Sequence, residues 1–442
     1  MANIGFISLG CAKNQVDCER MMYRVQEAGF TVQPDVVGCD AVVINTCGFI
    51  DSAKSEAIDH ILQMGQLKEQ GLVGKILVTG CLSQRYQQDI LREMPEVDGI
   101  LGTGSYTEIV PALEKILSGD SVQDFGSIDA PEVETGRILT TPEHYAFIKI
   151  AEGCDNRCAY CIIPYLRGKF RSRQMDDVLY EARLLAASGI KELIVVAQDT
   201  SRYGTDFPEH KRLLPELLRQ LCKIEGLQWI RLHYVYPDEI DDELIRVMAE
   251  ESKIVKYLDI PIQHCNSKIL KLMNRRGDGA FLRDLFAKLR RNIPGLVLRT
   301  SVITGLPGEG EEEFSELCEF LKEQRLERVG AFPFSPEEGT PAAEMEFVDG
   351  DIAQERAQMV ESIQSRIMDD YNASMIGKTL DVLIDGYDEE FTQFFGRTYA
   401  DSPEIDGRVW IASEESLVEG AFVKVCIDGM IDGDLSGYIV EE

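Results

Sequence analysis

Three cysteines stand together near the middle of the chain, in the segment Cys154-Asp155-Asn156-Arg157-Cys158-Ala159-Tyr160-Cys161. Their spacing is C-x3-C-x2-C, and it directly follows the apolar stretch of residues 145–151. Three soft thiolates this close in sequence can hold three irons of a 4Fe–4S cubane and leave its fourth iron open to a small ligand. A structural zinc site would need a fourth protein ligand, and no Cys or His lies near enough in sequence to complete the usual paired spacing. The segment therefore predicts an iron–sulfur cluster on Cys154, Cys158 and Cys161, which we call the loop cysteines.

Three other cysteines each follow a short β-rich run within a few residues; we call Cys11, Cys47 and Cys81 the strand-end cysteines. Helical patterns alternate with these runs, which indicates a parallel sheet. The carboxyl ends of strands form the binding edge of such a sheet, so we expect the three thiols to converge there and hold a second cluster. The alternative is that each cysteine is a small residue at a tight turn beside a glycine. The runs are residues 4–9, 41–44 and 75–78, the helical patterns residues 16–28, 53–67 and 84–93, and the glycines Gly10, Gly48 and Gly80.

Five of the remaining cysteines lack such placement. Cys18 falls inside a helical pattern and Cys39 precedes a strand, so we interpret both as packing or surface residues. Cys222, Cys265 and Cys318 show no ligand spacing.

The composition indicates a globular cytoplasmic protein. With 442 residues and 44% hydrophobic content, the chain is long enough for about three packed domains. Its start does not resemble a signal peptide, and no apolar run approaches the roughly 18 residues that a membrane span needs. In a reducing compartment twelve cysteines are poor disulfide candidates and better metal ligands. The 76 acidic residues against 45 basic ones give a net charge of −31, which repels a phosphate backbone and favours a basic partner.

The pattern of strands and helices predicts three domains, at residues 1–130, 140–372 and 374–442. Residues 120–143 are acidic and contain Pro and Thr without periodicity, which predicts a linker. Beyond it, six strand-like runs alternate with helical stretches, which suits a partial (β/α)6 barrel better than a closed eightfold one. These runs are residues 146–151, 193–197, 229–234, 257–260, 297–303 and 328–332.

Polar residues and a Gly/Pro loop follow several of these runs, at the ends where barrel chemistry takes place. We therefore expect them to line a cofactor pocket. Each also has a structural interpretation, as a helix cap, a turn or a buried histidine at the barrel rim. Arginines after the loop cysteines can meet a carboxylate, although a solvated charge run is equally consistent with the sequence. The pocket candidates are Gln198, Asp199, His233, Gln263, His264, Thr304, Gly305, Gly308 and Glu309, and the arginines Arg167, Arg171 and Arg173.

The tail, residues 374–442, consists of short strands broken by Gly and Asp, as expected of a small β-barrel. It carries four Lys and Arg against sixteen Asp and Glu. Such a surface should avoid phosphates and accept a Lys/Arg-rich protein. We expect an acidic cluster such as Asp401, Glu404 and Asp406 to take part in this contact.

With Tyr160 before the last thiol, the loop resembles the radical S-adenosylmethionine superfamily, whose pattern is C-x3-C-x-aromatic-C. The segments around the strand-end cysteines resemble the amino-terminal domain of methylthiotransferases, and the tail resembles a TRAM domain. Within that family the chain looks like the RimO type, from which it departs at Ala12, usually proline there, and at Cys265, usually alanine. The segments that carry the RimO likeness are residues 10–14, 196–200 and 396–407.

This resemblance implies an α/β methylthiotransferase that modifies the β-carbon of an aspartate in small-subunit ribosomal protein twelve, uS12. It implies two 4Fe–4S clusters, on the loop cysteines and the strand-end cysteines, and two molecules of S-adenosylmethionine. One is cleaved to a 5′-deoxyadenosyl radical that takes the hydrogen, and the other methylates the sulfur that the second cluster delivers. No side chain is needed as a nucleophile. Expected partners are uS12, the small ribosomal subunit and an electron donor such as a flavodoxin, with neither a membrane nor a nucleic-acid substrate.

Two other functions stay open on the sequence alone. One is a transfer-RNA methylthiotransferase of the MiaB type, which would need a basic face on the tail. The other is a non-catalytic iron–sulfur carrier, which would not need a pocket loop at residues 304–309 or a six-unit barrel.

Overall fold

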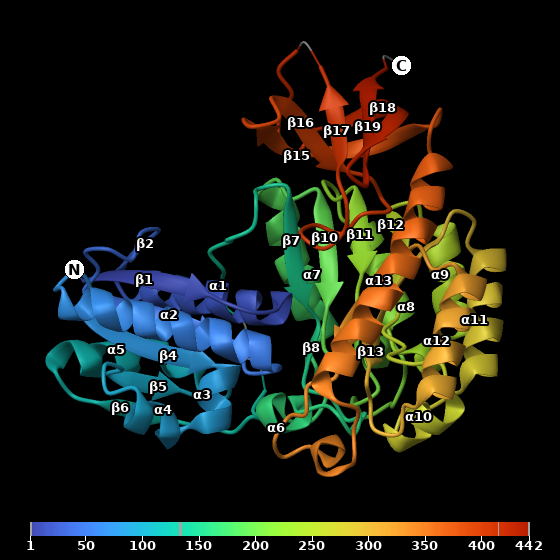
Figure 1. Ribbon diagram of the computed structural model, residues 1–442. Coiled ribbons are helices and arrows are strands. Elements are labelled where there is room, and N and C mark those ends of the chain that lie inside the picture. Colours follow the sequence, from blue (N-terminus) through green and yellow to red (C-terminus); the bar gives the residue numbers. More distant parts are fainter. Residues whose placement is uncertain (1, 132–134, 414, 441–442) are drawn as a thin grey trace.

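The computed structural model describes residues 2–131, 135–413 and 415–440. In this part of the chain, three main sheets follow one another along the sequence (Figure 1). The predicted fold class is confirmed, because two of these sheets are parallel and the third is a closed barrel. Among the described helices, none is both long and apolar enough to pass through a lipid bilayer. The domain limits stay predictions, and the three sheets fall within them.

The first sheet has six parallel strands in the order β2-β1-β3-β4-β5-β6. Helices α1 and α5 cover one face, and α2, α3 and α4 cover the other. The elements are β1 (Asn3–Ser8), α1 (Ala12–Glu27), β2 (Thr31–Gln33), β3 (Ala41–Thr46), α2 (Asp51–Glu69), β4 (Lys75–Gly80), α3 (Cys81–Tyr86), α4 (Gln88–Glu93), β5 (Gly99–Leu101), η1 (Tyr106–Glu108), α5 (Ile109–Ser118) and β6 (Val122–Asp124).

The sequence patterns found β1, β3 and β4 but missed β2, β5 and β6. Each missed strand has three residues, too few to show a period of two. The expected linker at residues 120–143 was partly wrong, because β6 lies inside it and pairs with β5. The helix expected at residues 84–93 is divided at Gln87, whose φ of 42° cannot continue a right-handed helix.

The second sheet has six parallel strands in the order β14-β13-β12-β11-β10-β7, with the helices on its outer side (Figure 1). Its strands are β7 (Tyr145–Lys149), β10 (Glu192–Val196), β11 (Trp229–Leu232), β12 (Ile254–Asp259), β13 (Val297–Thr304) and β14 (Arg328–Pro333). Its connections are β8 (Ala151–Glu152), α6 (Ile163–Arg167), β9 (Arg171–Ser172), α7 (Met175–Ala187), η2 (Thr200–Arg202), α8 (Leu214–Cys222), η3 (Pro237–Glu239), α9 (Asp242–Glu250), α10 (Ser267–Leu272), α11 (Gly279–Asn292), α12 (Glu311–Gln324) and η4 (Pro341–Glu344).

Apolar stripes attach these helices to the sheet. In α8, leucines at positions 214, 217, 218 and 221 are buried, which is the spacing of one helix face. Cys265 is buried in the same core, and Cys222 and Cys318 pack against it. Cys18 and Cys39 are buried in the first domain, as packing residues.

The tail forms a closed barrel in the order β15-β16-β17-β19-β18, reached through the long helix α13 (Gly350–Ala373). Its strands are β15 (Thr379–Asp388), β16 (Gln393–Arg397), β17 (Val409–Ala412), β18 (Phe422–Ile431) and β19 (Asp434–Ile439). In Figure 1 this barrel sits at one end of the second sheet, and β8 and α6 lie at the opposite end.

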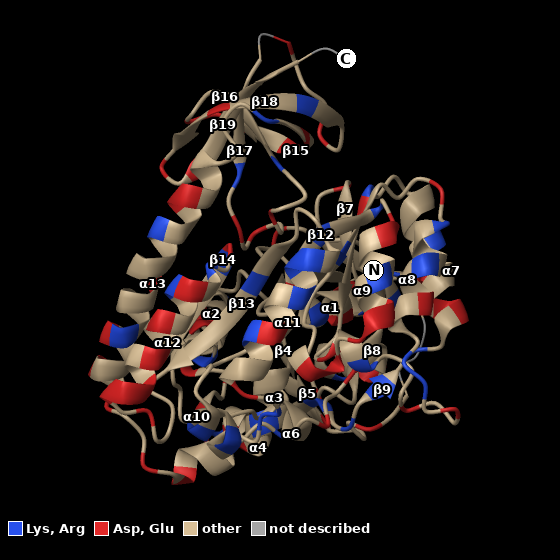
Figure 2. Ribbon diagram, turned by 90° about the vertical axis from the view of Figure 1, so that its right-hand side faces the viewer, with Lys and Arg blue, Asp and Glu red and all other residues tan. Residues whose placement is uncertain are grey.

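The loop between β16 and β17 reaches from the tail to the first residues of the central strands, and acidic residues, red in Figure 2, lie along it. Asp401 is 3% exposed and pairs with Arg328 at 2.8 Å. Asp406 accepts a hydrogen bond of 2.7 Å from Tyr257, and Glu404 accepts one of 2.8 Å from Tyr145. The expectation that this cluster faces a partner protein was therefore wrong for Asp401 and Asp406, whose carboxylates bind the central domain, whereas Glu404 is exposed.

Candidate iron–sulfur site

The three strand-end cysteines lie at one edge of the first sheet, because β1, β3 and β4 are neighbours and run parallel. Cys11 is the N-cap of α1, Cys47 follows β3 directly, and Cys81 is the first residue of α3. A methyl group on Gly10 would come within 2.7 Å of the Cys47 β-carbon. The glycines thus serve a close approach of the cysteine-bearing turns, so their structural role accompanies the convergence.

The strand-end thiols influence one another electrostatically. Burial and the neighbouring Cys81 raise the pKa of Cys47 to about 11. Burial would also raise the pKa of Cys11, but Lys13 and Arg167 outweigh it and lower that pKa. A thiol with a raised pKa is protonated at neutral pH until a metal displaces its proton, so the clustered thiols form a soft donor set for iron.

The loop cysteines follow β8 in a segment that backbone hydrogen bonds fix in place. Gly153 has a φ of 79°, and a β-carbon there would come within 2.1 Å of the Lys169 carbonyl oxygen, so only glycine fits. The Cys154 amide donates to the Gly168 carbonyl at 3.1 Å, and the Cys161 amide donates to the Cys158 carbonyl at 3.0 Å. The segment is thus a folded turn that keeps its three thiols close together.

Neighbouring helices hold this turn from outside. The Ala159 amide donates to the Met273 carbonyl at 2.9 Å, and Asn274 donates to the Arg157 carbonyl at 2.9 Å. Burial raises the pKa of Cys154 to about 11, and burial together with Cys158 raises the pKa of Cys161. Cys154 and Cys161 therefore keep their protons at neutral pH until a metal displaces them.

A buried arginine that sequence reasoning missed contacts the loop cysteines. The Arg275 guanidinium lies 3.6 Å from the Cys158 sulfur and donates to the Tyr160 hydroxyl at 3.0 Å. The Tyr236 hydroxyl is also 3.6 Å from the Cys158 sulfur, and its ring lies beneath the Arg275 guanidinium. No motif marked either residue, because both approach the loop only through tertiary packing.

Asp199, predicted from its place after β10, lies beside the cysteine loop. Its carboxylate accepts a hydrogen bond of 2.7 Å from Asn156, between two loop cysteines, and another of 3.2 Å from the Ser201 amide. The cap interpretation is therefore confirmed for Asp199, and its role in a cofactor pocket stays a prediction. Gln198 donates to Glu152, and among the described residues nothing bonds its buried amide oxygen.

The other pocket candidates show mainly structural contacts. Thr304 donates to the Ala353 carbonyl at 2.8 Å, and a β-carbon on Gly305 would come within 2.4 Å of Ala353. A β-carbon on Gly308 would meet Leu272 at 2.7 Å, and Gln263 bonds to β13 through its backbone. These contacts explain the residue types by the packing of α13 and α10, and a role in binding a cofactor stays a prediction.

The two histidine candidates are buried away from solvent. His264 lies 3.4 Å from Glu309, which Arg356 also binds at 2.9 Å. His233 lies 3.1 Å from the Ser402 hydroxyl, so it points toward the loop from the tail.

The two cysteine sets meet at α6, which follows the loop cysteines. Ile162 and Leu166 pack against Cys81. Arg167 donates to Asn14 at 2.8 Å and to Glu152 at 3.3 Å, and it also binds Asp17. The expected meeting of Arg167 with a carboxylate is therefore observed, and it joins the first two domains. Arg173 likewise binds Glu181 at 2.7 Å, and Arg171 lies 3.7 Å from Asp129.

Within the described ranges, no three His, Cys, Asp or Glu side chains converge closely enough to hold a single metal ion. A cubane carries its irons at separate corners, so its thiolates surround a body and do not point at one atom. Two sets of three thiols fit two such clusters.

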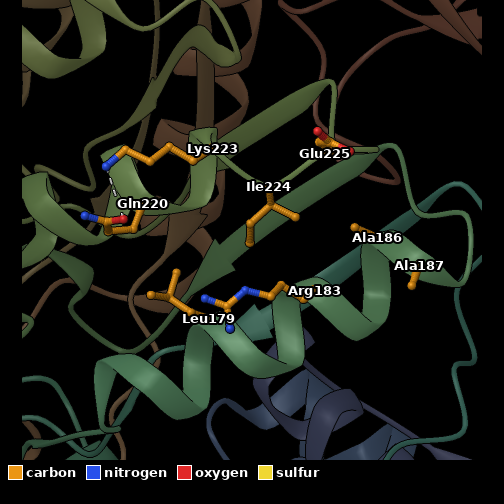
Figure 3. Close-up of a pocket in the computed structure, with 8 residues that line it drawn as sticks. All are labelled: Leu179, Arg183, Ala186, Ala187, Gln220, Lys223, Ile224 and Glu225. Carbon is orange, nitrogen blue, oxygen red and sulfur yellow. Dashed lines mark hydrogen bonds between the residues drawn. The ribbon is translucent and has the colours of Figure 1, made fainter.

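A surface pocket of about 370 Å³ lies elsewhere, between α7 and α8 on the outer side of the central sheet (Figure 3). Figure 3 shows Leu179, Arg183 and Ile224 facing it, and no cysteine is among its lining residues. It is separate from the iron–sulfur site.

Family models match three parts of the chain: the radical SAM superfamily at residues 148–321, the uncharacterized protein family UPF0004 at 3–102 and the TRAM domain at 376–440. Curated relatives named ribosomal protein uS12 methylthiotransferase RimO match nearly the whole chain. The relative from Caldanaerobacter subterraneus subsp. tengcongensis is 46% identical over 99% of this chain and 100% of its own. The relative from Lachnoclostridium phytofermentans is 47% identical over 98% of this chain and 99% of its own.

Among solved structures, the radical S-adenosylmethionine methyltransferase TsrM from Kitasatospora setae has a TM-score of 0.56. It is 13% identical, and the match covers 75% of this chain and 73% of that one. The cobalamin-dependent S-adenosylmethionine radical enzyme OxsB has a TM-score of 0.52 at 13% identity, over 82% of this chain and 56% of that one. Both likenesses concern the fold alone.

Proposed function

We propose that this chain, which belongs to the RimO family of radical SAM methylthiotransferases, transfers a methylthio group to the β-carbon of an aspartate in ribosomal protein uS12. The observation that carries this proposal is the pair of cysteine triads, one at the edge of the first sheet and one in the loop after β8, joined through α6 and Arg167. The β-hydrogen of an aspartate is too weakly acidic for a side-chain base, so its removal needs a cofactor radical. The sulfur then needs a carrier within reach of the same carbon.

The loop cysteines would hold the cluster that binds S-adenosylmethionine, and the strand-end cysteines would hold the cluster that carries sulfur. When bound, these groups supply the radical that takes the β-hydrogen and the methylated sulfur that replaces it. The chain's own residues position and enclose them. We assign Gln198, Asp199, Gln263, Thr304, Gly305 and Gly308 to the S-adenosylmethionine pocket, and Arg275 to the loop-cysteine cluster as a positioning residue.

The proposed partner is a Lys/Arg-rich ribosomal protein in the cytoplasm, and its docking surface is on the tail. Glu389 and Glu390 are exposed at the turn after β15, beside Phe391, which is 53% exposed and packs on Trp410 at 4.9 Å between ring centroids. An aromatic surface with an acidic rim suits basic side chains and their apolar stems.

The tail contacts the starts of the central strands, and the loop cysteines follow their ends. A substrate that is bound at the tail must therefore reach from the starts of the central strands to their ends. For β13, whose eight residues span roughly 26 Å, this is the length of the strand. An electron donor such as a flavodoxin would supply the electron that cleavage of S-adenosylmethionine consumes.

Mass spectrometry of uS12 and of bulk transfer RNA, after incubation with the reconstituted enzyme, S-adenosylmethionine and reductant, tests the proposal. We expect one methylthio group in place of one hydrogen on uS12. A modified transfer RNA with unmodified uS12 would favour the MiaB type and refute the proposal.

A further inference from the structure

Lys13 lies where the first domain meets the interior of the central sheet. It is the second residue of α1, two residues after Cys11, and only 8% of its surface is exposed. Its ammonium lies 3.5 Å from the centroid of the Tyr234 ring, which packs among residues of β7 and β10. The side chain thus crosses from the strand-end cysteines into the partial barrel.

In the described part of the chain, no carboxylate lies within ion-pair distance of the Lys13 ammonium. Tyr234 is its contact partner, and Cys11 and Glu152 act on it electrostatically. Burying a charge without a close counter-ion is costly. In a chain with 76 acidic residues, a carboxylate beside Lys13 could offset that cost. Four other buried cations of the barrel and the junction each face a carboxylate: Lys149, Arg167, Arg231 and Arg328.

Arg275 also lacks a carboxylate partner, but its donors are occupied. They point at the Cys158 sulfur, the Tyr160 hydroxyl and the Pro261 carbonyl oxygen. An ammonium has three donors, and a ring face holds it without neutralising its charge. Lys13, with no carboxylate within ion-pair distance among the described residues, can therefore bind a further anion at the junction.

We propose that Lys13 binds the side-chain carboxylate of the substrate aspartate and is the residue that selects aspartate over its uncharged analogue. This inference rests on the proposed function. The carboxyl carbon is bonded directly to the β-carbon that receives the sulfur. A cation beside Cys11 therefore lies next to the carbon that must approach the strand-end cysteines. The ion pair would offset the cost of bringing the carboxylate into the junction.

The competing role for Lys13 is to balance the negative charge of thiolates at the Cys11 set. The two roles differ in what they predict for the substrate. A carboxylate-binding residue changes the preference for aspartate over asparagine, whereas a residue that acts only on the cluster slows both substrates equally and shifts the cluster's reduction potential.

The test uses the holoenzyme with both clusters reconstituted, uS12, and uS12 with the target Asp replaced by Asn. We expect the wild type to prefer aspartate by at least about 100-fold in kcat/KM, because a site built for a charged group rejects its neutral analogue. Lys13→Met should lose about 100-fold on aspartate and little on asparagine, so the ratio falls toward one. Lys13→Arg should keep most of the preference, and Lys115→Met, the same change at an exposed lysine of α5, should change nothing.

Iron content and 5′-deoxyadenosine formed without uS12 should stay at the wild-type level in Lys13→Met. An unchanged aspartate-to-asparagine ratio, with or without a shifted reduction potential, would overturn the proposal. If Lys13→Met loses iron, the same ratio in Lys13→Gln decides, and loss of iron in both variants assigns Lys13 to the cluster and rejects the proposal. A wild type that modifies neither form of uS12 would instead refute the proposed function.

Discussion

The two cysteine sets reach the same kind of arrangement by different means. The loop cysteines lie within eight consecutive residues, and one turn, fixed by Gly153 and by neighbouring carbonyl groups, brings them together. The strand-end cysteines are spread over 71 residues, and only the order β1-β3-β4 brings them together. A local turn forms a site from nearby residues, whereas a sheet must fold completely before its site exists. The second set should therefore depend more on the stability of its domain.

The sharpest test of the comparison removes one set at a time. The reconstituted protein should hold about eight irons, and replacing the loop cysteines by Ala should leave about four and abolish cleavage of S-adenosylmethionine. Replacing the strand-end cysteines by Ala should also leave about four, with 5′-deoxyadenosine still formed and no methylthio product. Iron analysis and product chromatography measure both.

An iron content unchanged by replacement of the loop cysteines would contradict the first assignment. Methylthio product from the strand-end variant would return those cysteines to a structural role.

The second prediction removes the contacts by which Arg167 connects the two cysteine sets. Arg167→Met leaves the buried carboxylates of Asp17 and Glu152 with less compensation, so the free energy of unfolding should fall by about 3–5 kcal/mol. Urea denaturation of the apoprotein measures it. Arg92→Met, at an arginine that is 69% exposed, should change stability far less. If both substitutions lowered the free energy of unfolding equally, the ion pairs of Arg167 would contribute no more to stability than an exposed arginine does.

The third prediction compares the two turns directly. Gly153→Ala forces a β-carbon against the Lys169 carbonyl and should cost about 2–4 kcal/mol and the irons of the loop set. Gly80→Ala, where a β-carbon would come within 2.4 Å of the Thr46 carbonyl oxygen, should cost a similar amount and the irons of the strand-end set.

The control for both is Gly189→Ala, which has a φ of 111° and open space around it. It should cost about 1–2 kcal/mol and no iron. If either site variant kept all its iron, the turn would not be what positions that set.

The smallest effect concerns the tail. Changing Glu389 and Glu390 to Lys should weaken binding of uS12 severalfold at low salt and less at 0.15 M, where screening limits attraction to about 8 Å. Formation of 5′-deoxyadenosine without uS12 should be unaffected. The control reverses Glu355 and Glu361, which are exposed on α13. If both pairs weaken binding equally, net charge and not the tail surface attracts the partner.

The features that could be predicted from the sequence are those that local residue patterns encode. Strand-like runs that alternate with helical stretches located the six central strands, and the placement of three cysteines after strands located the sheet edge. It could not predict Arg275, Tyr236 or Lys13 at the site, because each contacts it only through packing between distant elements. The tail shows the same limit, since Asp401 and Asp406 differ from exposed acids only by the arginine and tyrosine opposite them.

The buried bridge at the base of the central sheet has a consequence for biosynthesis. Arg397 binds Glu192 at 2.6 Å, and Glu192 also binds Arg231 at 2.7 Å, with all three side chains almost fully buried. A nascent chain that ends before residue 397 leaves Glu192 without one of these partners. The interior of a domain begun at residue 145 is therefore completed only by residues synthesised about 250 positions later. We expect the final closure of this domain to wait until the tail has been synthesised.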